Sequence, residues 1–132
     1  MIPIILLIVY VVSMKLLIAD DSELLRQNFR KLLDGSQTIT DIIEAGTVFD
    51  TLRQVKAARP EVLVLDIQLP DGSGFDVLHA LFDTPQEFQP IVIVFTNFPS
   101  EHNRRKSYDL GARFFFDKSN EYEQLIELLD SL

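Results

Sequence analysis

The sequence predicts an α/β fold: a doubly wound, five-stranded parallel sheet with five helices, in three layers. Apolar runs of strand length alternate five times with segments of helical periodicity, which is typical of such a sheet. Two of the runs, residues 62–65 and 91–95, contain no polar side chain, as expected for strands buried on both faces. Right-handed crossovers leave few topologies, and five units of this size fit the strand order 2-1-3-4-5.

The first predicted strand covers residues 16–19 and runs directly into Asp20 and Asp21. Ser22 is a suitable N-cap for the helix that follows, and Gly35 is a suitable residue for the turn that ends it. The apolar residues of this helix recur at helical spacing; they are Leu25, Phe29, Leu32 and Leu33.

Residues 38–45 predict an edge strand, because they carry Asp41 and Glu44 and alternate poorly. A helix opens at Gly46-Thr47 and ends before Pro60, since proline does not continue a helix. The central strand, residues 62–65, then ends on Asp66.

The second half of the chain repeats the pattern. Helical spacing predicts helices over residues 75–82, from Ser100 to about 110, and over about 120–131. Strands are predicted over 91–95, followed by Thr96, and over 114–116, followed by Asp117-Lys118.

Composition excludes several classes of function. A chain of 132 residues predicts one domain. Its net charge of −8 argues against a nucleic-acid-binding surface, which must neutralise phosphates with Lys and Arg. The absence of cysteine excludes disulfides and thiolate metal sites, and two histidines make a His-based zinc site improbable.

The N-terminus is unusual, because residues 2–12 carry no charge. The run is shorter than the roughly 20 apolar residues of a membrane-spanning helix, and it lacks the basic region and cleavage site of a secretory signal. We therefore expect Met14 to begin the functional domain, 14–132, and residues 1–13 to be an appended segment. That segment could be an upstream start, an added sequence or an extra strand; a membrane anchor is the alternative.

Polar residues follow the apolar runs at the ends of four of the five predicted strands. They are Asp20 and Asp21 after the first, Asp66 after the third, Thr96 after the fourth and Lys118 after the fifth. The carboxyl ends of parallel strands meet at one edge of the sheet, so we expect these side chains to share a crevice there. Any one of them could instead be a cap, a loop residue or a solvated charge.

This set of groups suits phosphoryl transfer. Clustered carboxylates and a backbone carbonyl are hard oxygen ligands of the kind Mg²⁺ prefers. A carboxylate can also act as the nucleophile that forms an aspartyl phosphate. Lys118 would add positive charge to the phosphoryl oxygens, and Thr96 would add a hydroxyl donor.

These residues, together with the segments 18–22 and 66–72 and Gly111-Ala112, resemble the receiver domain (CheY-like) of two-component response regulators. The resemblance covers about residues 14–132. It includes the family's intervals of 30 residues from Asp66 to Thr96 and 22 from Thr96 to Lys118. It implies a flavodoxin-like fold and a bacterial, cytoplasmic phosphoprotein that accepts a phosphoryl group from a histidine kinase or phosphotransfer protein.

The resemblance also implies a role for each residue. Asp66 would be the phospho-acceptor, and Mg²⁺ would be held by Asp20, Asp21, Asp66 and the backbone carbonyl of Gln68. Lys118 would pair with the phosphoryl group, or with Asp66 before phosphorylation. Thr96 and the aromatic ring of Phe115 would form the switch.

Three positions depart from the family pattern. Phe115 lacks the hydroxyl of the Tyr often found there. Ser119 stands where many members have proline after the lysine, so a cis peptide is not expected. Asn97 stands where a smaller residue is frequent, which would restrict access to the phosphoryl group and change its lifetime.

The predicted function is a single-domain response regulator and conformational switch, not an enzyme acting on a separate substrate. The downstream protein target would dock on the face formed by the fourth helix, the fifth strand and the fifth helix. This face includes Phe115 and the basic run Arg104-Arg105-Lys106, for which a solvated helix surface is the alternative. Neither a nucleic-acid partner nor membrane binding is expected.

Two other functions remain as alternatives. A pseudo-receiver would bind partners without being phosphorylated. A phosphohydrolase of the haloacid dehalogenase type would also use an Asp at a strand end, but it normally needs a second Asp two residues later, and that position is Gln68.

Overall fold

The computed structural model describes residues 13–132, so residues 1–12 of the predicted appended segment lie outside it. The main sheet is parallel and has the order β2-β1-β3-β6-β7, which confirms the predicted 2-1-3-4-5 arrangement. Its strands are β1 (Met14–Ala19), β2 (Ile39–Ala45), β3 (Val62–Leu65), β6 (Ile91–Thr96) and β7 (Phe114–Asp117).

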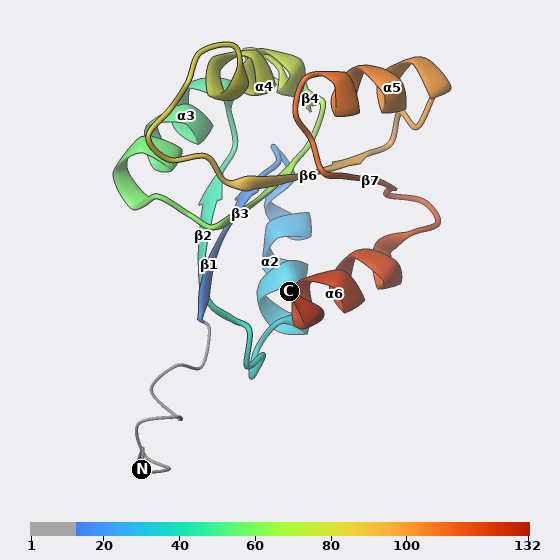
Figure 1. Cartoon of the computed structure of the whole chain (residues 1–132). Helices are drawn as coiled ribbons and strands as arrows, with labels where there is room; N and C mark the ends of the chain where they lie inside the picture. The colour runs from blue at the N-terminus through green and yellow to red at the C-terminus, as the bar shows by residue number, and fades with distance from the viewer. Residues whose placement is uncertain (1–12) are drawn as a thin grey trace, which may run out of the picture.

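Helices cover both faces of this sheet (Figure 1). Helices α2 (Glu23–Leu32) and α6 (Tyr122–Ser131) lie on one face. Helices α3 (Val48–Ala58), α4 (Gly74–Phe82) and α5 (Glu101–Asp109) lie on the other. The three layers and the five helices of residues 13–132 agree with the fold predicted from the sequence.

Strand β1 shows why the inner strands are apolar throughout. Leu17 and Ala19 point into the core beneath α3 and α4, whereas Leu16 and Ile18 point into the core beneath α2 and α6. All four are fully buried. Alternate residues of a strand point to opposite faces, so a strand with helices on both sides needs apolar residues at every position.

Side-chain caps fix where three of the helices begin, as the sequence predicted. Ser22 accepts a hydrogen bond from the Leu25 N–H, Thr47 from the Asp50 N–H and Ser100 from the Asn103 N–H. Such caps satisfy N–H groups of the first turn, which have no partner inside the helix. These three helices start three to five residues after the strand that precedes each of them.

The structure differs from the prediction after β3. A small antiparallel pair, β4 (Gln68–Leu69) with β5 (Gly72–Ser73), lies between β3 and α4, and the sequence did not predict it. Ser73 then caps α4, and the Ser73 N–H donates to Asp76 Oδ2, forming a capping box. Two-residue strands carry too little periodicity to be found in a sequence.

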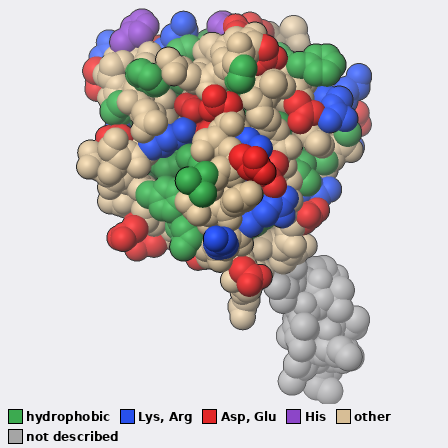
Figure 2. Space-filling model, turned by 180° about the vertical axis from the view of Figure 1, so that it is seen from behind, with side chains coloured by type: hydrophobic (Ala, Val, Ile, Leu, Met, Phe, Trp, Pro, Cys, Tyr) green, Lys and Arg blue, Asp and Glu red, His purple; other side chains and the backbone are tan. Residues whose placement is uncertain are grey.

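The surface is mixed in charge, although the chain is acidic. On the face drawn in Figure 2, acidic and basic side chains of the described residues are interspersed. Within residues 13–132, no helix combines the length and the apolar character that crossing a bilayer would require.

Candidate functional site

Three carboxylates meet at the carboxyl edge of the sheet. Asp66 directly follows β3, and Asp20 and Asp21 directly follow β1, its neighbour in the sheet. One oxygen from each of the three acids lies within 4.8 Å of one oxygen from each of the others. Asp20 and Asp66 are buried, at 2% and 6% exposure, whereas Asp21 is exposed. The sequence prediction that these acids share one crevice is confirmed for this triad.

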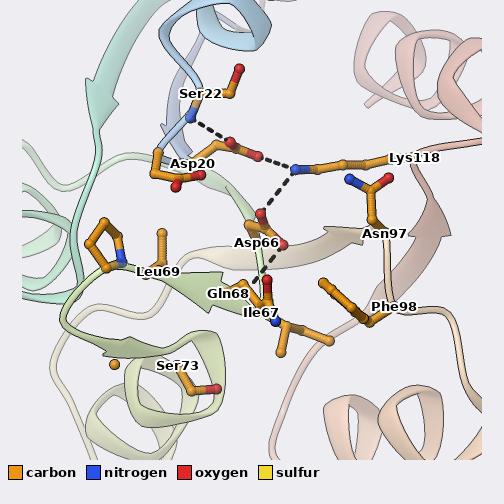
Figure 3. A pocket seen from close by; sticks show the side chains of 13 residues that line it. Asp20, Ser22, Asp66, Ile67, Gln68, Leu69, Ser73, Asn97, Phe98 and Lys118 are labelled. Carbon is orange, nitrogen blue, oxygen red and sulfur yellow. Dashed lines mark hydrogen bonds and ion pairs between the residues drawn. The ribbon is translucent and has the colours of Figure 1, made fainter.

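Lys118 joins two of these acids from the far edge of the sheet. It follows β7, and its Nζ lies 2.5 Å from Asp20 Oδ2 and 2.9 Å from Asp66 Oδ2 (Figure 3). Only 11% of the lysine side chain is exposed. The ammonium is therefore held inside the site between two carboxylates.

Burial and charge set the protonation of this pair. Burial raises the pKa of the Asp66 carboxyl, and so does the negative charge of Asp20; the ammonium of Lys118 opposes both without cancelling them. For Lys118, burial favours the neutral amine, but hydrogen bonds to Asp20 and Asp66 outweigh it and raise the pKa of the ammonium. One ammonium thus faces two carboxylates, so the site keeps an excess of negative charge that a further cation could neutralise.

An open cavity of about 580 Å³ lies over the acids. Its wall includes the β3–β4 segment, the side chains that follow β1, and Asn97, Phe98 and Lys118 (Figure 3). The Gln68 N–H donates to Asp66 Oδ1 at 3.3 Å, which orients the carboxylate from below. The residues fit Mg²⁺, because oxygen ligands are clustered beside an open space that can admit water and a phosphate oxygen.

A close backbone approach shapes the floor of this cavity. The Gly74 N–H donates to the Ile67 carbonyl at 2.7 Å, which folds the chain back against the acceptor strand. A Cβ at position 74 would overlap the backbone oxygen of Asp66 and lie 3.0 Å from Ile67 Cα. Position 74 therefore requires glycine because no side chain fits there.

Residues 16–130 match the family model of the response regulator receiver domain. The chain belongs to this family. The match extends over both the acidic residues after β1 and the lysine after β7, which are the residues that the structure brings together.

Curated relatives share the receiver domain and are longer than this chain. The transcriptional activator DevR/DosR of Mycobacterium tuberculosis is 32% identical over 98 residues, which are 74% of this chain and 44% of that protein. The sensory transduction protein LytT of Bacillus cereus is 28% identical over 88% of this chain and 46% of its own length. The chain thus spans about half the length of these relatives.

Solved structures support the fold. A signal receiver domain of a DNA-binding response regulator from Colwellia psychrerythraea has a TM-score of 0.80 at 24% identity, covering 89% of this chain and 96% of that one. A DNA-binding response regulator of the LuxR family from Staphylococcus aureus has a TM-score of 0.78 at 24% identity, covering 89% and 97%.

The two predicted switch residues of this receiver domain lie behind the cavity. Thr96 is fully buried at the end of β6, and its Oγ1 accepts a hydrogen bond from the Phe98 N–H at 3.2 Å. Phe115, on β7, is 3% exposed, and the guanidinium of Arg104 lies over its ring at 4.7 Å from the ring centroid. Neither side chain lines the cavity.

The basic run on α5 points in more than one direction. Arg104 covers Phe115 and lies 4.0 Å from Glu121, whereas the ammonium of Lys106 lies 4.4 Å from the centre of the Phe75 ring on α4. Arg105, with a side chain 75% exposed, extends from the helix surface beside Glu101. The three charges therefore do not form a single patch; Arg105 and Lys106 are exposed, and Arg104 is half-buried.

Sequence reasoning missed the residues that hold the acid-bearing loops in place. Asp71 accepts hydrogen bonds from the Val48 and Phe49 N–H groups, at 2.7 and 3.0 Å, and so ties the acceptor loop to the start of α3. Arg26 donates to the backbone oxygen of Asp20. Both contacts join residues on different elements, and no local spacing indicates them.

Proposed function

We propose that this receiver domain is a magnesium-dependent phosphoryl switch whose acceptor is Asp66. One observation carries the proposal: a buried carboxylate at the end of the central strand lies 2.9 Å from a buried ammonium and within 4.8 Å of two further acids. A structural ion pair does not need a third, exposed carboxylate beside an open cavity, whereas Mg²⁺ is bound by clustered carboxylate oxygens and the cavity leaves room for a phosphoryl group.

The chemistry is a transfer from a phosphohistidine to a carboxylate. An oxygen of Asp66 attacks phosphorus, the bond between phosphorus and the donor's imidazole nitrogen breaks, and the imidazole leaves with the bonding electron pair. Asp20, Asp21, Asp66 and the Gln68 carbonyl would hold Mg²⁺, which when bound would offset negative charge on the phosphoryl oxygens. The ammonium of Lys118 would bind another phosphoryl oxygen.

Phosphorylation would then shift a conformational equilibrium. A phosphoryl group on Asp66 would attract the hydroxyl of Thr96, which now accepts from the Phe98 N–H. A shift of β6 and its loop would change the packing of Phe115 beneath Arg104. The phosphoryl group would favour one of two arrangements, which is a population shift.

The partners follow from the family and from the surface. Receiver domains of two-component systems interact with histidine kinases, and we infer that such a kinase or a phosphotransfer protein is the donor, in the cytoplasm. A downstream protein would dock on the α5–β7–α6 face, where Arg105 is exposed. The domain would promote its own phosphorylation and dephosphorylation instead of acting on a separate substrate.

Acetyl phosphate with Mg²⁺ tests the proposal. Intact-protein mass spectrometry should show the addition of one phosphoryl group to the wild type and none to Asp66→Asn. Asp109→Asn, a change at an exposed acid of α5, is the matched control and should be labelled like the wild type. An unlabelled wild type would instead indicate a pseudo-receiver that binds partners without phosphorylation.

A further inference from the structure

The guanidinium of Arg26 binds the backbone next to the metal-binding acids. Its Nη1 donates to the Asp20 backbone oxygen at 2.5 Å. That carbonyl belongs to the peptide between Asp20 and Asp21, beyond the end of β1, where the sheet ladder has stopped. The hydrogen bond therefore fixes the peptide plane from which both carboxylates project.

A second set of contacts fixes Arg26 itself. Its Nε donates to Glu44 Oε1 on β2 at 2.8 Å, while Arg30, one turn later on α2, donates to Glu44 Oε2 at 2.7 Å. The Arg26 side chain is only 17% exposed. Burial raises the pKa of Glu44, but the hydrogen bonds and charges of Arg30 and Arg26 outweigh it and lower the pKa overall. Glu44 is thus an ionised anchor for the guanidinium at neutral pH.

We propose that Arg26 is a positioning residue for the metal site: its planar fork joins Glu44 to the Asp20 carbonyl and so holds the acids of the β1–α2 loop in the geometry that binds Mg²⁺. The proposal rests on the proposed function of the site. A guanidinium can make two hydrogen bonds in a fixed plane, and an ammonium cannot reproduce that geometry. Arg26 has no carboxylate of the acidic triad as a partner, so it acts through the backbone.

An explanation from charge alone predicts the opposite change in Mg²⁺ affinity when Arg26 is removed. Arg26 is a cation close to a cation site, so its removal should strengthen Mg²⁺ binding if charge alone mattered. Positioning predicts weaker binding, because the loop that carries two ligands would lose its fixed orientation. Loss of a residue that orients metal ligands typically costs about 10- to 100-fold in metal affinity. The sign of the change therefore separates the two explanations.

The experiment compares Mg²⁺ affinity in Arg26→Met, Arg26→Lys and Arg30→Met by isothermal titration calorimetry. The amide chemical shifts of Asp20 and Asp21, measured by NMR in the absence of metal, report directly on the conformation of the β1–α2 loop. Arg30→Met is the matched control, because it removes one charge and one ion pair to Glu44 from the same helix but leaves the bond to Asp20. Circular dichroism checks that each variant is folded.

We expect Arg26→Met to bind Mg²⁺ about 10- to 100-fold more weakly, with shifted Asp20 and Asp21 amides. Arg26→Lys should be weaker than the wild type as well, and it replaces Arg26→Met if that variant does not fold. Arg30→Met should bind as well as the wild type or more tightly. Unchanged or tighter binding in the folded Arg26 variants would overturn the inference alone. A wild type that neither binds Mg²⁺ nor becomes labelled by acetyl phosphate would overturn the proposed function and the inference together.

Discussion

Lys118 is the residue on which the charge balance of the site depends. Its ammonium contacts two carboxylates whose side chains are only 4% and 8% exposed. Because its pKa is raised above the usual 10.5, this contribution to stability is complete at neutral pH and is lost only as the pH rises through the raised value. Without the lysine, Asp20 and Asp66 would be neighbouring buried acids with no cation between them.

We expect Lys118→Met to lower the free energy of unfolding by about 3 kcal/mol in the absence of Mg²⁺, because it leaves buried charge unpaired. Added Mg²⁺ should stabilise this variant more than the wild type, since both carboxylates are then free to bind the ion. Urea denaturation with and without Mg²⁺ measures both effects. Lys31→Met, at an exposed position of α2, is the control. Equal denaturation midpoints for Lys118→Met and the wild type would contradict the prediction.

At the scale of elements, the capped helices and apolar strands were predictable because local spacing encodes them. Residues 62–65 and the caps Ser22 and Ser100 are examples. The position of the acids after two neighbouring strands followed from the topology of a parallel sheet. The contacts of Arg26, Asp71 and Gly74 were not predictable, because each depends on the distance between separate elements and not on local spacing.

The turn from β3 into α4 depends on the missing side chain of Gly74. Gly74→Ala should lower the free energy of unfolding by about 1–3 kcal/mol, because its methyl group must push the Asp66 carbonyl away in a packed site. The midpoint temperature of thermal unfolding and the rate of labelling by acetyl phosphate should both fall. Gly46→Ala is a suitable comparison, since a Cβ there lies 3.6 Å from its nearest neighbour, an ordinary contact. Wild-type labelling by Gly74→Ala would argue against a crowded acceptor loop.

The stability that the ion pairs between α2 and β2 contribute should depend on pH through the charge of Glu44. Its pKa is lowered below the usual 4.5 in the folded protein, so its contribution is present above 4.5 and is lost as the pH falls through the lowered value. Glu44→Gln should therefore be less stable than the wild type at pH 7, and the difference should shrink as the pH falls below 4.5. Urea denaturation at several pH values measures this. A constant difference would show that Glu44 does not act through its charge.

At the scale of the whole molecule, the helices are attached to the sheet to different extents. The residues Phe29 on α2, Leu33 directly after that helix, and Leu125 and Leu129 on α6 are fully or nearly fully buried in one core. Helix α5, on the opposite face, buries only Ser107 and is also held by the cation–π contacts of Arg104 and Lys106. A helix with so little buried apolar surface is the element of this fold that can move at least cost.

We therefore expect phosphorylation to change hydrogen exchange most in α5 and β7 and least in α2. Acetyl phosphate with Mg²⁺ should alter the exchange of amides 98–116 in the wild type, and Asp66→Asn should show no such change. Hydrogen–deuterium exchange with mass spectrometry provides the measurement. Changes confined to the residues that line the cavity would contradict a switch that reaches the α5–β7–α6 face.

The bond between Lys118 and Asp20 joins residues 98 positions apart in the chain. During synthesis on a ribosome, the acidic residues emerge early, while the lysine that pairs with them emerges only after nearly all of the sheet. A nascent or prematurely terminated chain would thus carry the aspartates without their ammonium. The ion pair of the acidic site can therefore form only after almost all of the receiver domain has been translated.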